Sequence, residues 1–180
     1  VGSEMCIRDS AERAQRNLSK AISIPTISYP EKEHVDFTQF DKFHEFLDEA
    51  YPLIHKTLTK EVICEASLMY CWKGTRSDLD PIALLAHQDV VPISEGTEGD
   101  WEHPPFEGYN DGEFIWGRGA LDMKNHLIGV MEAVETLLEE GFTPAPTGAA
   151  GRSFRTNGAD PAAGGGYPGS RGSGPRSGGN

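Results

Sequence analysis

Apolar residues recur at three- and four-residue spacing in two segments of the chain. Phe37–Tyr51 places four large apolar side chains on one helical face, and Pro52 follows it directly. Met123–Glu140 repeats the pattern with six apolar residues, and the glycine at position 141 is a common helix stop. Both segments predict amphipathic helices that pack one face against a core. A third helix is expected over residues 11–22.

Three shorter apolar runs predict strands. Glu61–Glu65 and Ser67–Lys73 are rich in β-forming residues and read as two strands. Between Pro81 and Pro92, the run Ile82–Ala86 is entirely apolar. Such a run is typical of a strand that is buried on both faces in the middle of a parallel sheet.

A histidine and an aspartate follow this apolar run. Polar groups just past the carboxyl end of such a strand lie where open α/β sheets bind ligands. Residues i and i+2 of a strand point to the same side, so His87 and Asp89 can face one site. Neutral imidazole is a good zinc ligand, and a carboxylate that accepts its other N–H fixes the tautomer. For this short pattern alone, a buried hydrogen-bonded histidine and a loop-capping aspartate are the more common explanation.

Another aspartate lies at the start of the second predicted helix. A short aromatic segment, Phe114–Trp116, is followed by the glycine-flanked Arg118, which predicts a sharp turn. Asp122 then lies at or just before the helix N-terminus, where an ordinary N-cap is the simpler explanation. Arg118 could bind a substrate carboxylate through its forked guanidinium, although a structural pairing that holds the turn is favoured.

Together these stretches resemble the M20 family of zinc metallopeptidases, especially its carboxypeptidase S branch and the related N-acyl-amino-acid hydrolases. The resemblance rests on LLAHQDVVP, GTEGDWEHPPFEGYNDGEFIWGRGALDMKN and LIGVMEAVETLLEEGFTP, which occur in that order within about residues 12–144. It implies part of a zinc-peptidase catalytic domain. We therefore expect an α/β fold with a mostly parallel central sheet flanked by helices, and with irregular tails.

The resemblance also implies roles for single residues. His87 is expected to ligate one zinc ion, Asp89 to be the catalytic-site aspartate that orients it, and Asp122 to bridge two zinc ions. The peptide bond after the bridging aspartate is cis in this family, so a cis Asp122–Met123 bond is expected. The implied substrate is a peptide C-terminus or an N-acyl amino acid, and aminoacylase or deacylase chemistry on the same metals stays open.

The segment Ile93–Gly112 shows no clear periodicity. A structureless loop of that length in a compact domain is usually functional. Its prolines and aromatic residues can pin the loop by packing, or Trp101 and Phe106 can shape the wall of a substrate pocket. His103 lies in the same loop, but the family motif places no metal ligand there.

Composition narrows the classes of partner. The 180 residues carry a formal net charge of -12 at an isoelectric point near 4.8, so no basic surface is expected for nucleic acid. The sequence shows no apolar run long enough to span a membrane and no signal peptide. The compartment is therefore unknown, and cytoplasmic by default. The three cysteines match neither a disulfide framework nor a zinc spacing.

The two ends depart from the family pattern. Residues 1–10 are expected to be an artefactual leader, and residues 11–147 to be the N-terminal part of the catalytic domain. Residues 148–180 hold 11 of the 21 glycines and almost no large apolar side chains. This composition predicts a disordered or out-of-frame tail.

The family's general-base glutamate, its remaining metal ligands and its dimerising lid domain are missing from this sequence. We therefore expect an inactive fragment that binds zinc weakly and exposes a sheet edge. A homodimer would need the missing lid. The alternatives are a non-catalytic binding module and a non-functional product of a faulty gene model.

Overall fold

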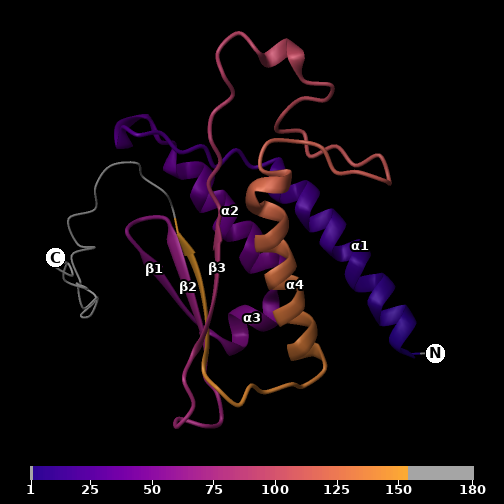
Figure 1. Ribbon diagram of the computed structural model, residues 1–180, viewed down its shortest axis with the longest axis vertical. Coiled ribbons are helices and arrows are strands. Elements are labelled where there is room, and N and C mark those ends of the chain that lie inside the picture. Colours follow the sequence, from indigo (N-terminus) through magenta and orange to yellow (C-terminus); the bar gives the residue numbers. More distant parts are fainter. Residues whose placement is uncertain (1, 154–180) are drawn as a thin grey trace, which may run out of the picture.

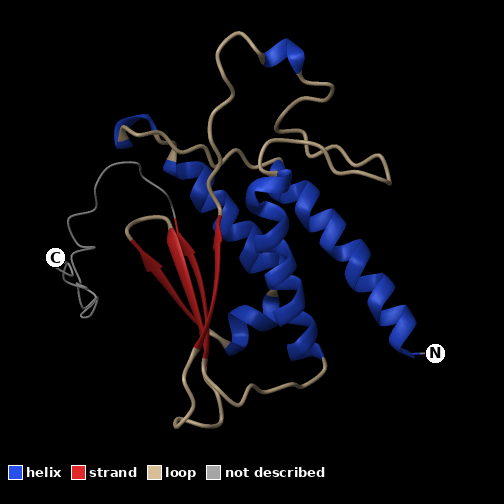
Figure 2. Cartoon of the chain, viewed as in Figure 1, coloured by secondary structure: helices blue, strands red, loops and turns tan. Residues whose placement is uncertain are grey.

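Figure 1 shows the computed structural model of the chain, which describes residues 2–153. Four α-helices are present in this part: α1 (Gly2–Ile22), α2 (Phe37–Ala50), α3 (Pro52–Thr57) and α4 (Asn125–Glu139). They lie on one side of a sheet of four strands, β1 (Thr59–Ile63), β2 (Ser67–Trp72), β3 (Ile82–His87) and β4 (Gly148–Ser153) (Figure 2). Within residues 2–153, no helix combines the length and apolar character needed to cross a membrane.

The order of the strands is β1-β2-β4-β3. The pairs β1–β2 and β2–β4 are antiparallel, whereas β3 and β4 are parallel. The α/β class is confirmed, but the described sheet is mixed rather than mostly parallel. The reason is the length of the connections: β1 and β2 are joined by a tight turn, which forces them antiparallel, whereas β3 reaches β4 through α4.

The predicted helical faces form the core. Asp36 caps α2 by accepting the backbone N–H of Thr38 at 3.0 Å, and the apolar face that follows is buried. On the sheet side, Leu68 and Tyr70 of β2 are buried against this face. The main cluster joins α1, α2, α3, α4 and β2, and its fully or nearly fully buried members include Ala21, Phe43, Leu47, Tyr51, Ile54, Leu68, Tyr70, Leu127, Ile128 and Met131.

Both predicted irregular tails are partly ordered. Helix α1 begins at Gly2, so residues 2–10 continue the helix that was expected from residue 11. No residue from 3 to 10 is proline or glycine, and extending a formed helix costs far less than nucleating one. At the other end, residues 148–153 form β4, because the facing edges of β2 and β3 satisfy its backbone groups. Residues 154–180 lie outside the described residues.

Strand β3 is not buried on both faces as its apolar sequence predicted. Ile82, Leu84 and Leu85 are 56%, 45% and 70% exposed. In the described part of the chain, β3 is at the edge of the sheet, and the helices cover only one face (Figure 2). The exposed sheet edge expected from the sequence is therefore present.

Candidate metal centre

The segment that follows β3 is held on its far side by a neighbouring loop. The backbone N–H of Val90 donates to Thr26 O, and that of Ser28 donates to Val90 O, each at 2.9 Å. The Thr26 hydroxyl also donates to the carbonyl of Gln88 at 2.6 Å. These bonds extend the strand geometry past its last residue, His87, and keep alternate residues on opposite sides.

Gln88 anchors the side of this segment that faces the core. It is fully buried, and its amide N–H donates to Ala66 O while its Oε1 lies 3.1 Å from His44 Nε2. Burial lowers the pKa of His44, so the neutral imidazole is favoured there, although the contact with Gln88 acts in the opposite direction. The residues on either side of Gln88 are thereby fixed in position.

Asp122 is positioned by a tight turn of the backbone. Gly119 adopts φ 84°, and a Cβ at this position would lie 2.5 Å from Val90 Cγ1, so only glycine fits. The peptide bond Asp122–Met123 is cis, which confirms the expectation drawn from the family resemblance. Asp122 itself is extended (φ -122°, ψ 96°), and α4 begins only at Asn125. Asp122 is therefore not an ordinary N-cap of this helix.

His87, Asp89 and Asp122 converge in the structure. His87 Nδ1 lies 2.9 Å from the carbonyl oxygen of Asp89 and 3.4 Å from Oδ1 of the same residue. His87 Nε2 lies 2.9 Å from Asp122 Oδ1. Asp89 is buried (4% exposed), whereas the Asp122 side chain is 88% exposed. The site is thus open on the side of Asp122 and closed behind Asp89.

The partners of Nδ1 decide the chemistry of this cluster. Both neighbours of Nδ1, the carbonyl and the carboxylate of Asp89, are hydrogen-bond acceptors, which favours the tautomer in which Nδ1 carries the proton. The lone pair of Nε2 then faces a carboxylate oxygen of Asp122. These two groups repel each other unless a positive charge lies between them. A second ring proton or a shared metal cation meets that need.

The residues present fit zinc in part. Asp89 Oδ1 is buried without a hydrogen-bond partner, next to the imidazole N–H that a zinc-bound histidine directs at a carboxylate. Imidazole nitrogen and carboxylate oxygen are both common zinc donors. Within the described residues, however, no group of three or more His, Cys, Asp or Glu side chains is placed to hold a metal ion.

Lys124 lies behind this cluster and was not foreseen from the sequence. Its side chain is fully buried, and Nζ donates to Ala21 O at 2.8 Å and to Ile24 O at 2.7 Å. Burial lowers the pKa of Lys124 to about 7, opposed by the charge of Asp89. The side chain ties the end of α1 to the turn that carries Asp122. Its apolar surroundings come from distant segments, so no local signal marks it.

A pocket of about 390 Å³ opens over the three residues. Trp101 and Arg118 line it, and the guanidinium carbon of Arg118 lies 5.2 Å from the centre of the Trp101 ring. Phe106 is not among the residues of its wall. Arg118 Nε is buried without a hydrogen-bond partner, and Arg118 forms no ion pair within the described residues.

His103 is not among the residues that line this pocket, and its ring packs on Tyr109, with ring centres 4.2 Å apart.

Comparison with known proteins identifies the class. Residues 83–148 match the sequence profile of peptidase family M20/M25/M40. The fold agrees: the M20 family metallo-carboxypeptidase Sso-CP2 from Sulfolobus solfataricus superposes with a TM-score of 0.60 over 78% of this chain and 30% of its own, at 17% identity. At that identity the likeness shows the fold alone. Over the part that it shares with these proteins, the chain belongs to the M20 peptidase family.

Two relatives define the branch more closely. The sequence is 42% identical to carboxypeptidase S of Saccharomyces cerevisiae over 137 residues, which make up 72% of this chain and 24% of that protein. It is 40% identical to the N-fatty-acyl-amino acid synthase/hydrolase PM20D1 of Mus musculus over 129 residues, 71% of this chain and 25% of that protein. The chain spans about a quarter of the length of these curated relatives.

Proposed function

We propose that this chain is part of a two-zinc amide hydrolase that acts on a peptide C-terminus or on an N-acyl amino acid. The observation that carries the proposal is the 2.9 Å approach of His87 Nε2 to Asp122 Oδ1, from positions 35 residues apart. These two donor atoms repel each other unless a second ring proton or a metal cation lies between them, and we propose that a metal does. The family membership of the chain supports the same conclusion.

The roles are those that the family resemblance implies, and the geometry of the cluster is compatible with them. His87 would ligate one zinc ion and Asp122 would bridge to a second, while Asp89 holds the imidazole in the tautomer that leaves Nε2 free. Bound zinc in such a site polarises the scissile carbonyl and lowers the pKa of a bound water. Trp101 would form one wall of the substrate pocket. Phe106 is not among the residues that line the pocket, so no wall role is proposed for it.

The substrate class rests on what the two relatives' names share. A carboxypeptidase and an N-fatty-acyl-amino acid hydrolase both act on an amide bond next to an amino acid that carries a free carboxylate. Arg118 offers a cation without an acidic partner in the wall of the pocket. The lack of an acidic partner supports a role for Arg118 in binding the substrate carboxylate, rather than a purely structural role in holding the turn.

We propose that residues 11–147 are the N-terminal part of an M20 catalytic domain, and that the 180-residue chain is inactive. The described residues provide two ligand atoms, whereas a catalytic zinc ion takes three protein ligands. The same shortage of ligands favours a second candidate function, a non-catalytic binding module that keeps the pocket. In the family, two adjacent glutamates supply the general base and a metal ligand. An intact pair of this kind encoded directly downstream in another reading frame would select the hydrolase.

Calorimetric titration with zinc tests the site. We expect the chain to bind zinc with a dissociation constant in the micromolar range or weaker. His87→Ala and Asp122→Asn should each weaken binding by at least about tenfold, and Asp89→Asn should weaken it by roughly tenfold through the misplaced imidazole. His34→Ala, which alters an exposed histidine far along the sequence, is the matched control.

Two results would contradict the proposal in different ways. Submicromolar zinc binding by the unaltered chain would show that further ligands are present, so the expected inactivity would be wrong. Zinc affinity that is unchanged in His87→Ala and lowered in His34→Ala would place the metal elsewhere and remove the basis for the hydrolase assignment.

A further inference from the structure

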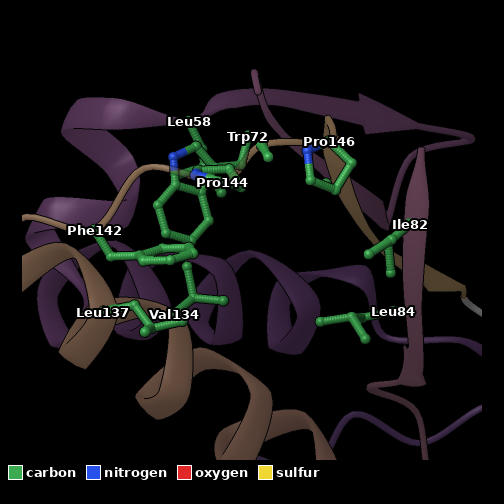
Figure 3. Close-up of a pocket in the computed structure, with 11 residues that line it drawn as sticks. Leu58, Trp72, Ile82, Leu84, Val134, Leu137, Phe142, Pro144 and Pro146 are labelled. Carbon is green, nitrogen blue, oxygen red and sulfur yellow. The ribbon is translucent and has the colours of Figure 1, made fainter. Parts of the chain in front are cut away.

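A second pocket lies between the sheet and the C-terminal half of α4, and its volume is about 300 Å³. Figure 3 shows its walls. Ile82 and Leu84 come from β3, and Val134 and Leu137 come from α4, while Trp72 comes from β2 and Phe142 from the loop after α4. All the side chains that line it are apolar. Nothing in the metal centre or the proposed function uses this pocket.

The pocket exists because the central strand supplies no side chain there. In the sheet register, Gly148 pairs with Trp72 on one side and with Ile82 on the other. Residues in register across a sheet point to the same face, so these three positions form one row facing α4. The middle member of the row is glycine, and a Cβ built on it would have Trp72 Cβ, 3.9 Å away, as its nearest heavy atom. The space between Trp72 and Ile82 is therefore left empty at Gly148.

The walls of the gap are fixed by backbone hydrogen bonds. The loop before β4 is bound to the β2–β3 loop, since Thr75 N–H donates to Pro144 O at 3.0 Å and Arg76 N–H donates to Ala145 O at 2.9 Å. Phe142 packs edge-to-face on Trp72, with ring centres 5.9 Å apart. Two prolines in this loop further restrict it. The pocket is thus formed before any ligand arrives.

The chemistry of the walls defines the ligand. Among the lining side chains only the indole of Trp72 carries a hydrogen-bond donor, and none carries a charge, so a charged or strongly polar molecule would lose most of its hydration without compensation. A dry cavity of about 150 Å³ binds benzene, so twice that volume suits a bicyclic aromatic molecule. Ile82 and Phe142, at 56% and 47% exposure, form the rim and leave a path from solvent.

We propose that this pocket binds a small, uncharged apolar molecule of the size of naphthalene. The site is separate from the metal centre: Ile82 begins β3 and His87 ends it, and a strand of six residues spans about 17 Å. Ligand binding here is therefore expected to leave zinc affinity unchanged.

Naphthalene is the probe, and the charged analogue naphthalene-2-carboxylate is its control. Chain labelled with ¹³C at methyl groups is titrated with each compound, and the methyl signals of Ile82, Leu84, Val134 and Leu137 are followed by NMR. Naphthalene should shift these signals saturably, and the carboxylate should not. At ten times its dissociation constant, naphthalene should raise the folded-to-unfolded ratio about elevenfold.

Two variants make the test specific. Gly148→Val adds a side chain in the open space of the row, so it should abolish the saturable shifts and raise the midpoint of thermal unfolding. Ala83→Val makes a similar change at an exposed position one residue along β3, which lies on the other face of the sheet, and should keep binding.

The outcomes separate cleanly. Loss of binding in Gly148→Val with binding kept in Ala83→Val supports the proposal. It would be overturned by equal binding to both variants, by equal shifts with the carboxylate, or by no saturable shift in a chain with dispersed methyl signals. A dimer in sedimentation that dissociates only in Gly148→Val would also overturn it, because a second copy would then be the occupant.

Discussion

The buried carboxylate of Glu135 allows a sharp test of how α3 and α4 pack. Glu135 belongs to α4 and is 3% exposed. Its two oxygens accept the backbone N–H groups of Leu53 and Ile54, each at 2.9 Å. These N–H groups lie in the first turn of α3, where no partner exists within the helix itself. Glu135 thus caps α3 from a different helix.

The structure gives the size of the effect. Glu135→Gln keeps one acceptor oxygen and presents an NH₂ group to the second backbone N–H, so one charge-assisted bond is lost. We expect a loss of about 1.5–3 kcal/mol in the free energy of unfolding. Glu135→Ala leaves both buried N–H groups without an acceptor and should cost about 3–6 kcal/mol. That is a large share of the roughly 5–15 kcal/mol that stabilises a typical domain.

Urea unfolding followed by tryptophan fluorescence measures both variants. Glu140→Gln is the matched control, because Glu140 lies at the exposed end of the same helix and should change stability by less than about 0.5 kcal/mol. If Glu135→Gln is as stable as Glu140→Gln, the carboxylate does not cap α3, and the reasoning about this interface is wrong.

Two further predictions concern the metal-centre scaffold. Gly119→Ala should destabilise the chain by at least about 1–2 kcal/mol, because its φ of 84° is left-handed and the new Cβ meets Val90. Gly129→Ala, in an open position of α4, should instead stabilise it by about 0.5–1 kcal/mol, and equal effects in urea unfolding would refute this contrast. Burial lowers the pKa of His44, so the unfolded chain binds a proton that the folded chain resists. The free energy of unfolding should therefore fall as the pH drops from about 7.5 to about 5.5, and His44→Gln should reduce this slope. An unchanged slope in that variant would count against a buried neutral His44.

Local patterns predicted the elements that bury a simple amphipathic face. The spacing of apolar residues gave α2 as Phe37–Tyr51 against the observed Phe37–Ala50, and α4 close to its observed start at Asn125. Both runs of β-forming residues are strands. In α2, α4 and β2 the burial of one face and the local propensity agree, whereas β1 is almost entirely exposed and follows from its β-forming residues and its pairing with β2.

The candidate site was accessible to sequence reasoning only through the family motifs. Pattern alone favoured a capped helix at Asp122 and a buried histidine at 87. The convergence of these residues and the cis bond at Asp122–Met123 followed from the resemblance, and both are present in the structure. Their metal-binding roles remain predictions that the zinc titration tests.

Local sequence patterns specify the helix faces, the β1–β2 strands and the motif that contains His87 and Asp122. Three features instead depend on contacts between distant segments: Gly148–Ser153 is a strand although it has no large apolar side chain, the apolar β3 is exposed, and Glu135 and Lys124 are buried. The difference arises because propensity acts over a few neighbouring residues, whereas the burial of a side chain and the partners of a backbone group depend on segments far away in the chain.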